Sequence, residues 1–242
     1  LANFEKLLTQ RNALLKRIGD GEARPDELGY WNEQLAQSAG VVIAGRQRLL
    51  RDLEVKARRV HRDLSGGNED LELSYQPSFL PTANNTGQLS FDVIGLDLNR
   101  QLKPDDIATQ YAATLEERRG EDIARGMTTI GPQRDELRLL VNGHDLGLYG
   151  SRGQARTAVM SLKLAELEWM RDVVGEWPIL LLDEVIAELD AAGRAYLLDR
   201  VSGAEQVLLT TTEPEIFTPE FLQKATRWHI HAGQIVTIQE GN

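Results

Sequence analysis

Two adjacent carboxylates end an apolar run near residue 180, and they could bind a cation and activate a water molecule. The run is Pro178-Ile179-Leu180-Leu181-Leu182, and Asp183 and Glu184 follow it. A strand that is buried on both faces has this pattern, and in an open sheet its carboxyl end opens onto the ligand crevice. Asp183 is therefore placed to hold a hydrated Mg2+, and Glu184 to orient or deprotonate an attacking water. A core strand that ends in a solvated acidic turn has the same pattern, so both interpretations stay open.

A turn rich in glycine, Tyr149–Arg156, precedes a predicted helix and could contact an anion. Gly150 and Gly153 let a backbone approach an anion closely, and a helix N-terminus offers unpaired N–H groups to a phosphate. The Ser151 hydroxyl could add a further donor. However, Ser151 and Gln154 also stand at the spacing of a helix capping box, which explains both residue types without any ligand.

Two further polar segments follow the carboxylate pair. Glu188-Leu189-Asp190 lies in a short loop, and the strand around Val207 ends in Thr210-Thr211-Thr212. Each is ordinary singly, because Asp190 could cap the next helix and threonines are common in strands. Their order behind the glycine turn and the apolar strand is that of the latter half of an ABC-type ATPase.

The elements that must position these residues follow from the periodicity of apolar residues and from turn signals. Helices are predicted over residues 3–19, 28–39, 41–64, 103–119, 153–174 and 191–201. Strands are predicted over residues 71–75, 89–94, 137–141, 178–183 and 206–211, with two more around Gly233. Asn142-Gly143 is a strong hairpin signal. The alternation of strands and helices after residue 130 predicts an α/β fold with a mainly parallel sheet and a final antiparallel edge pair.

Composition and charge limit the class of protein. The 242 residues are 41% hydrophobic and contain no cysteine, which excludes a disulfide framework and a thiolate metal site and fits a reducing cytoplasm. No apolar run approaches the ~20 residues that span a bilayer. The net charge of -10 argues against a protein coated in nucleic acid, so any DNA contact must be local. The opening Leu1-Ala2-Asn3-Phe4 has no initiator Met and suggests a chain entered partway through a longer protein.

One stretch, residues 46–62, has the opposite charge and is called the basic segment. It holds seven Arg and Lys residues against Asp52 and Glu54, a net charge of +5. Such a helix face could follow duplex phosphates without reading base sequence, with Arg48, Arg51 and Arg58 as candidate contacts. It could equally be a solvated face whose acidic neighbours are supplied by the fold.

Several blocks of the sequence together resemble the RecF family of ABC-type ATPases, which act in bacterial DNA repair. The blocks are Gly131–Glu136, Gly150–Arg156 with Ser161–Glu166, Leu180–Asp190 and Thr210–Thr212, and Gln10–Lys16 is similar to the family's helical arm. The resemblance implies a helical arm lobe with a little sheet over residues 1–130. It further implies the signature and Walker B portion, a C-terminal half of the ATPase lobe, over residues 131–242.

In that family two subunits meet head to head around two ATP molecules. Each nucleotide lies between the phosphate-binding loop and Walker B of one subunit and the signature motif of the other. The resemblance implies that Ser151, Gly153 and Gln154 contact the γ-phosphate across the dimer, with Arg156 and Arg134 in support.

The same resemblance assigns roles to the second half of the site. It implies that Asp183 serves Mg2+, that Glu184 acts in hydrolysis, that Asp190 belongs to the loop that crosses between subunits, and that Thr212 senses the γ-phosphate. Gln133 stands where the family usually has His, Glu184 where many members have Asp, and Ala187 where Ser is common.

The function implied is that of an ATP-gated DNA clamp in recombinational repair and replication restart. Its partners would be gapped or duplex DNA, a RecR-type loader protein and a second copy of the chain. However, the 242 residues contain no Gly-x4-Gly-Lys-Ser/Thr, so the phosphate cradle is missing and this chain alone should not hydrolyse ATP usefully. The alternatives are another SMC-like ATPase and a non-catalytic interaction module on the same fold.

Overall fold

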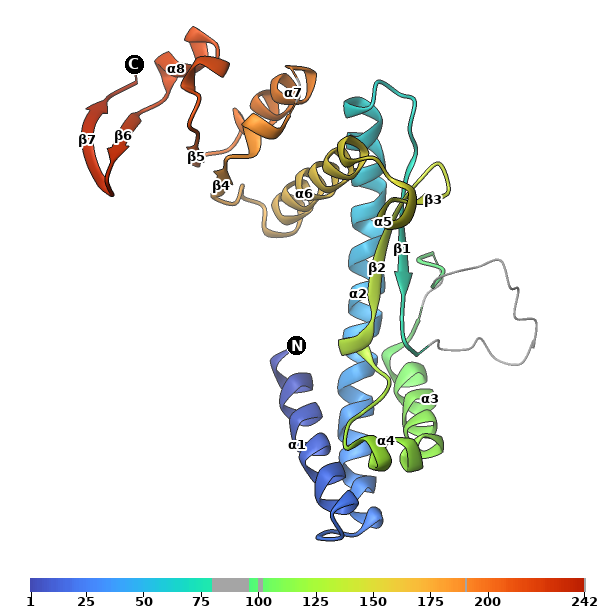
Figure 1. Cartoon of the computed structure of the whole chain (residues 1–242). Helices are drawn as coiled ribbons and strands as arrows, with labels where there is room; N and C mark the ends of the chain where they lie inside the picture. The colour runs from blue at the N-terminus through green and yellow to red at the C-terminus, as the bar shows by residue number, and fades with distance from the viewer. Residues whose placement is uncertain (80–95, 100–101, 190, 242) are drawn as a thin grey trace. The chain divides into compact units, whose positions relative to one another are not determined.

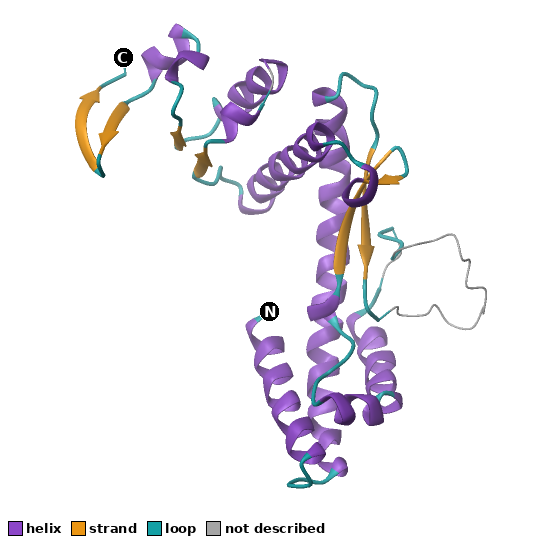
Figure 2. Ribbon diagram, in the orientation of Figure 1, coloured by secondary structure: helices purple, strands orange, loops and turns teal. Residues whose placement is uncertain are grey.

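The computed structural model describes residues 1–79, 96–99, 102–189 and 191–241 (Figures 1 and 2). The chain forms two compact units, Leu1–Trp169 and Met170–Asn242. This division does not coincide with the lobe boundary near residue 130, which stays a prediction. The strand predicted over residues 89–94 lies outside the described residues. Helix and strand are mixed as expected, so the predicted α/β class with a largely helical N-terminal part is confirmed.

Helix α2, Leu28–Leu64, is the longest element, and α1, Ala2–Gly19, packs beside its first half (Figure 1). A one-turn 3-10 helix, Pro25–Glu27, leads into α2. The prediction of two helices, 28–39 and 41–64, was wrong, because the chain continues through Gly40 without a break. A Cβ atom on Gly40 would lie 2.3 Å from the carbonyl oxygen of Pro104. The glycine therefore permits a close approach and does not end the helix.

The segment that approaches Gly40 is the start of α3, Pro104–Glu117, and α4, Arg119–Arg125, follows directly. Helix α3 packs along α2, and the two helices share a core with α1. Large side chains buried in that core include Phe4, Leu35, Ile43, Ile107, Tyr111 and Leu115. Burial raises the pKa of the Tyr111 phenol, whose hydroxyl donates to the Ile130 carbonyl.

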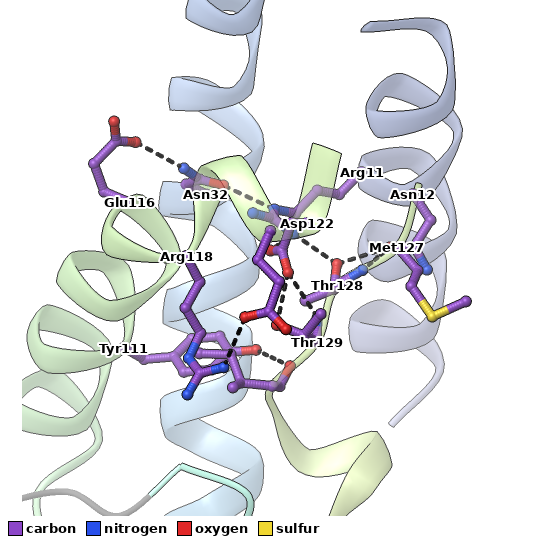
Figure 3. Close-up of polar contacts among 12 residues, drawn as sticks. Arg11, Asn12, Asn32, Tyr111, Glu116, Arg118, Asp122, Met127, Thr128 and Thr129 are labelled. Carbon is purple, nitrogen blue, oxygen red and sulfur yellow. Dashed lines mark hydrogen bonds and ion pairs between the residues drawn. The ribbon is translucent and has the colours of Figure 1, made fainter. Parts of the chain in front are cut away.

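A buried polar network ties α1 to α2 and α4 (Figure 3). Arg11 is 0% exposed, and its Nη1 atom lies 2.8 Å from Asp122 Oδ2 and 2.7 Å from Thr128 Oγ1. Its Nε donates to Asn32. Asp122 also accepts two hydrogen bonds from Thr129, through the backbone N–H and the hydroxyl. These further hydrogen bonds satisfy the oxygens of the buried ion pair, whereas Arg11 Nη2 is buried without a hydrogen-bond partner among the described residues.

The second half of α2 packs against a small antiparallel sheet. Strand β1, Leu71–Gln76, pairs with β2, Glu136–Val141, and a tight turn at Asn142-Gly143 leads to β3, His144–Asp145. The predicted hairpin is therefore confirmed. After the short helix α5, Leu146–Tyr149, comes α6, Arg152–Val174, whose Ala158 and Ala165 join the core between α2 and β1.

The unit Met170–Asn242 holds the predicted parallel strands. Strand β4, Leu180–Asp183, pairs in parallel with β5, Val207–Thr210, and α7, Ala191–Val201, connects them. Helix α8, Pro219–Lys224, precedes the antiparallel pair β6, Arg227–His231, and β7, Gln234–Gln239. In the described residues β6 and β7 form a sheet of their own and not an edge of the β4–β5 sheet.

The expectation that the apolar strand is buried on both faces was wrong for this chain. Leu180 is buried, but Leu181 is 73% exposed and Ile179 is 63% exposed. The reason is that no element among the described residues covers the face on which the Leu181 side chain lies.

Candidate nucleotide-binding residues

The carboxyl ends of β4 and β5 bring Asp183 and Thr210 side by side. The two residues are register partners in the parallel pair. The Thr210 hydroxyl donates to Asp183 Oδ1 at 2.5 Å, and its oxygen accepts from the backbone N–H of Glu184 at 3.2 Å. One threonine thus holds both the side chain of the first acidic residue and the backbone of the second.

Glu184 has a backbone conformation that non-glycine residues seldom adopt. Its φ is 55°, in the left-handed region, and a one-turn 3-10 helix, Val185–Glu188, begins directly after it. Such conformations persist only where surrounding structure imposes them, and they cluster at functional sites. Here the N–H of Glu184 is fixed by Thr210, so the turn directs the chain away from the strand immediately after Asp183.

The residues at this strand end fit a Mg2+ ion that is bound together with a nucleotide. Asp183 is exposed and keeps carboxylate oxygen available beside the Thr210 hydroxyl. Mg2+ commonly takes one or two carboxylates, several waters and phosphate oxygens, so a single protein carboxylate suffices when phosphates supply the rest. Glu184 is also exposed and could act on a water molecule at the same edge.

Thr212, also expected here, is not part of the Asp183–Thr210 contact. Thr212 is exposed, two residues beyond the end of β5, and Thr211 caps the following turn by accepting from the Glu213 N–H at 3.0 Å. Asp190 lies outside the described residues. The threonine that contacts Asp183 is therefore Thr210. The sequence placed it in the Thr210–Thr212 segment but assigned it no contact, because only the register of β4 against β5 pairs the two residues.

The signature turn, residues 150–156, begins α6 with a complete capping box. Ser151 Oγ accepts from the Gln154 N–H at 3.1 Å, and Gln154 Oε1 accepts from the Ser151 N–H at 3.0 Å. Both side chains therefore stabilise the helix start without a ligand. Within the described part of the chain, the N–H groups of Arg152 and Gly153 have no hydrogen-bond partner, so the turn still has two donors to offer to an anion.

The surroundings of the signature turn leave its outer face open. Ser151, Gly153 and Arg156 are exposed, and the nearest group to a Cβ atom built on Gly153 is Ser151 Oγ, at 3.9 Å. Gly150 is different, because a Cβ there would lie 2.6 Å from the Leu146 carbonyl oxygen. The first glycine is thus required by the turn itself, and the second leaves space beside the N–H groups.

The Gly131–Glu136 block forms a structural junction in the unit Leu1–Trp169. Asp135 accepts from Arg46 Nη1 at 3.2 Å, from the Ser78 N–H at 2.9 Å and from the Tyr75 hydroxyl. Burial, followed by the hydrogen bond to Asp135, raises the pKa of Tyr75 and keeps it a donor. Sequence reasoning missed Asp135, since its partners lie 57 to 89 residues away.

Arg134, expected to support the nucleotide site, has local contacts in this structure. Its Nε donates to the Thr128 carbonyl at 3.2 Å, and Nη2 lies 3.1 Å from Met127 Sδ. The arginine is exposed, so these contacts leave it accessible to solvent. Nothing among them connects it with the signature turn.

The basic segment lies on α2, and the fold supplies acidic partners to several of its arginines. Arg58 Nη2 lies 2.9 Å from Asp70 and 3.5 Å from Glu72, and Arg51 pairs with its neighbour Asp52. Further ion pairs of the segment are Arg46 with Asp135, Arg59 with Glu168 and Arg62 with Asp70. Arg48 is exposed.

Comparison with known proteins identifies extensive similarity along the chain. The chain is 40% identical over 237 residues to the DNA replication and repair protein RecF of Heliobacterium modesticaldum, and 39% identical over 238 residues to that of Acaryochloris marina. These alignments cover 97% of this chain and 58% and 59% of the relatives. The chain thus spans less than two thirds of the length of these relatives. No protein-family model matches it.

Two solved structures have the same fold. One is described as the recombination mediator protein RecF-ATPrS in the RecFOR pathway, and it superposes with a TM-score of 0.76 at 29% identity, over 97% of this chain and 56% of the other. The second, described as RecF-ATP in the same pathway, has a TM-score of 0.71 at 30% identity, over 88% of this chain and 52% of the other.

Proposed function

Because the chain belongs to the RecF family, we propose that it forms part of an ATP-binding clamp on DNA in recombinational repair and replication restart. In the whole protein, ATP would lie between two subunits. One subunit would contribute its phosphate cradle and Asp183, and the other its signature turn. The solved relatives described with ATP and with an ATP analogue support the nucleotide as the ligand.

The observation that carries this proposal most directly is the geometry of the signature turn. Ser151 and Gln154 close the capping box between themselves, and among the described residues the N–H groups of Arg152 and Gly153 have no partner at the start of α6. Such a terminus attracts negative charge, and the absent side chain of Gly153 lets a phosphate approach. Ser151, Gly153 and Gln154 would then contact the γ-phosphate held by the partner subunit, with Arg156 beside them.

The end of β4 supplies the complementary half of the proposed site. Asp183 would bind Mg2+, Glu184 would act on the attacking water, and Thr212 and Asp190 would complete the γ-phosphate and cross-subunit contacts. The exposed apolar side chains of Ile179 and Leu181 support further elements packed on this strand in the whole protein, since both faces of a parallel sheet are normally covered.

Partners follow from the same proposal. The relatives described in the RecFOR pathway favour a RecR-type loader protein as partner and gapped or duplex DNA as substrate. The basic segment of α2 would supply DNA contacts that do not depend on base sequence.

Ser151 allows a direct test in the whole protein. Ser151→Arg should leave the monomer folded and able to bind ATP through its own cradle, yet abolish ATP-driven dimerisation, because the side chain would occupy the γ-phosphate position of the partner. Sedimentation with and without a slowly hydrolysed ATP analogue measures the effect. Dimers of wild-type strength would refute the composite site.

Ser151→Ala is the matched control, because it removes the cap without adding bulk. It should lower the free energy of unfolding by about 1 kcal/mol with or without nucleotide, since the lost hydrogen bond lies within one subunit. Thermal unfolding of both variants therefore separates a loss of the cap from a blocked interface.

A further inference from the structure

A series of hydrogen bonds between buried and half-buried side chains connects the signature turn with helix α2. Gln154 uses its oxygen in the capping box and donates from Nε2 to Glu69 Oε1 at 2.8 Å. Glu69 Oε2 lies 3.0 Å from His61 Nε2, and His61 Nδ1 lies 3.2 Å from Ser161 Oγ. Since Ser161 belongs to α6, the series of hydrogen bonds begins and ends on the helix that carries the signature turn.

The residues at the two ends of this hydrogen-bond series, Ser161 and Gln154, decide which atoms donate and which accept. The Ser161 hydroxyl donates to the Thr157 carbonyl at 2.6 Å, so its oxygen accepts from His61 Nδ1. The carboxylate of Glu69 accepts from Gln154 on one oxygen and faces His61 Nε2 on the other. The two ring nitrogens of His61 thus each face an oxygen, Ser161 Oγ beside Nδ1 and Glu69 Oε2 beside Nε2.

Burial gives this arrangement its rigidity. His61 and Ser161 are 0% exposed, and the side chain of Glu69 is 21% exposed. A histidine in such a position has no water with which to replace a lost partner, so each contact restricts the others. Glu69 contacts both the signature turn, through Gln154, and α2, through His61.

Asp70, the residue after Glu69, contacts two arginines of the basic segment. Asp70 pairs with Arg58 at 2.9 Å and with Arg62 at 3.0 Å, and both arginines lie on α2. Two adjacent acidic residues between α2 and β1 therefore hold the basic segment on one side and the signature turn on the other. A shift of the end of α2 must move both sets of contacts together.

We propose that Glu69 is a positioning residue that fixes Gln154 in the signature turn and, through His61, couples the turn to the basic segment of α2. The proposal rests on the proposed function of the signature turn as a contact across the dimer. In addition, the end of α2 holds the turn. Binding of a ligand to the basic segment therefore affects the nucleotide interface through these side-chain contacts.

The test compares two substitutions of Glu69 in the whole protein. Glu69→Ala removes the acceptor of Gln154 and should weaken ATP-dependent dimerisation about tenfold or more, the loss expected for a hydrogen bond to a charged group. Glu69→Gln should restore most of it, because the amide oxygen can accept from Gln154 while the amide nitrogen donates to His61. ATP affinity of the monomer should stay at the wild-type value in both variants.

A double-mutant cycle distinguishes positioning from general destabilisation. Gln154→Ala with Glu69→Ala should weaken the dimer no more than Gln154→Ala alone, because Glu69 acts through Gln154. Glu166→Ala, which removes an exposed carboxylate of the same helix α6, is the control and should leave dimerisation unchanged. Additive effects, equal weakness of Glu69→Ala and Glu69→Gln, or a wild-type dimer for Glu69→Ala would overturn the proposal.

The outcome also separates this proposal from the one on which it rests. If Ser151→Arg and Gln154→Ala both dimerise as wild type does, the composite nucleotide site itself fails. If those two variants lose the dimer and Glu69→Ala keeps it, the site stands and only the positioning role of Glu69 is refuted.

Discussion

Thr210 shows how one hydroxyl can hold two residues for which roles in ATP hydrolysis are proposed. Its hydroxyl proton is directed at Asp183 and its oxygen receives the N–H of Glu184. Since a hydroxyl provides one proton and accepts with its lone pairs, both contacts are made at once. The carboxylate of Asp183 is thereby held at the strand edge, and the backbone of Glu184 is held in its left-handed conformation.

Asp183 and Glu184 should therefore differ in what their amide variants lose. In the whole protein, Asp183→Asn should weaken Mg-ATP binding, whereas Glu184→Gln should leave binding intact, slow hydrolysis and accumulate the ATP-bound dimer, because the lost group acts on water. Equilibrium binding of a labelled nucleotide and single-turnover hydrolysis separate these effects. Equal loss of ATP binding in both variants would contradict the division of roles, and an absence of ATPase activity in the wild-type protein would favour a non-catalytic module.

Removing one member of the buried Arg11–Asp122 pair should destabilise the chain strongly, because the other charge then stays buried without its partner. Asp122→Ala leaves the charge of Arg11 buried without its partner and should lower the free energy of unfolding by about 3–5 kcal/mol. Glu121→Ala removes the adjacent carboxylate, whose pairs with Arg118 and Arg125 are exposed, and should cost about 0–1 kcal/mol. Urea unfolding followed by the helical circular dichroism signal compares the two, and similar losses would argue against a stabilising network.

For single residues, the sequence predicts contacts between neighbours in the sequence and misses contacts that depend on the fold. The capping box of Ser151 and Gln154 spans three residues, and its spacing alone predicted it. The contacts of Thr210 with Asp183 and of Glu69 with Gln154 span 27 and 85 residues, so strand register and helix packing had to be known first. Distant polar partners leave no periodic pattern, because one carboxylate in a loop resembles any other.

Among the elements, α2 shows that a glycine can permit close packing between two helices without ending either of them. Gly40 interrupts an otherwise favourable helical sequence, which is why two helices were predicted. In the fold the residue faces the backbone of Pro104, where α3 begins, and the absent side chain lets the two helices approach. Buried Ala36, Ala39 and Ala44 around it extend the same close contact.

Two glycines of α2 should respond oppositely to alanine. Gly40→Ala places a Cβ 2.3 Å from the Pro104 carbonyl oxygen and should destabilise the chain by about 1–3 kcal/mol, because backbone must move. Gly45→Ala, five residues on, meets nothing within 4 Å and should stabilise the helix by about 0.5–1 kcal/mol. Urea unfolding measures both variants. A gain of stability at Gly40 would show that α2 and α3 can separate at no cost.

Elements with a clear period were predicted well, and the arrangement of sheets was not. Helix α7 begins and ends where its periodicity indicated, and Asn142-Gly143 gave the β2–β3 hairpin. The apolar composition of β4 predicted burial on both faces, but burial depends on strands and helices that pack from elsewhere. Likewise, local pattern could not decide whether β6 and β7 join the parallel sheet or pair with each other alone.

For the whole molecule, the distribution of charge decides how it could meet DNA. The net charge is -10, and much of the local positive charge of the basic segment is paired with acidic residues from other elements. The sequence left two interpretations open, a DNA-binding face and a solvated face. The acidic partners fit a solvated face, and the exposed arginines on α2 fit a DNA-binding face. Within the described ranges, no helix combines the length and the apolar character needed to cross a bilayer.

Salt dependence distinguishes a phosphate-binding face from general charge. If the basic segment contacts DNA, replacing Arg48, Arg51 and Arg58 together by Gln in the whole protein should lower affinity similarly for all duplex sequences. Each lost phosphate contact reduces the slope of log affinity against log salt by about 0.9, so the slope should fall by up to about 3. Losing Arg58 should add to the effect, because Asp70 and Glu72 lose a counter-charge.

A second triple variant keeps the change in net charge the same and moves it to another part of the unit. Arg118, Arg119 and Arg125 are exposed arginines at α3 and α4 that pair with Glu116 and Glu121. Replacing all three by Gln should leave the salt slope at its wild-type value, since phosphate contacts are local and charges beyond about 10 Å are screened at 0.1 M salt. Fluorescence anisotropy with duplex DNA over a range of salt concentrations compares the two triple variants. Equal slopes in both variants and the wild type would make the basic segment a solvated surface, and equal losses in both would attribute DNA affinity to net charge alone.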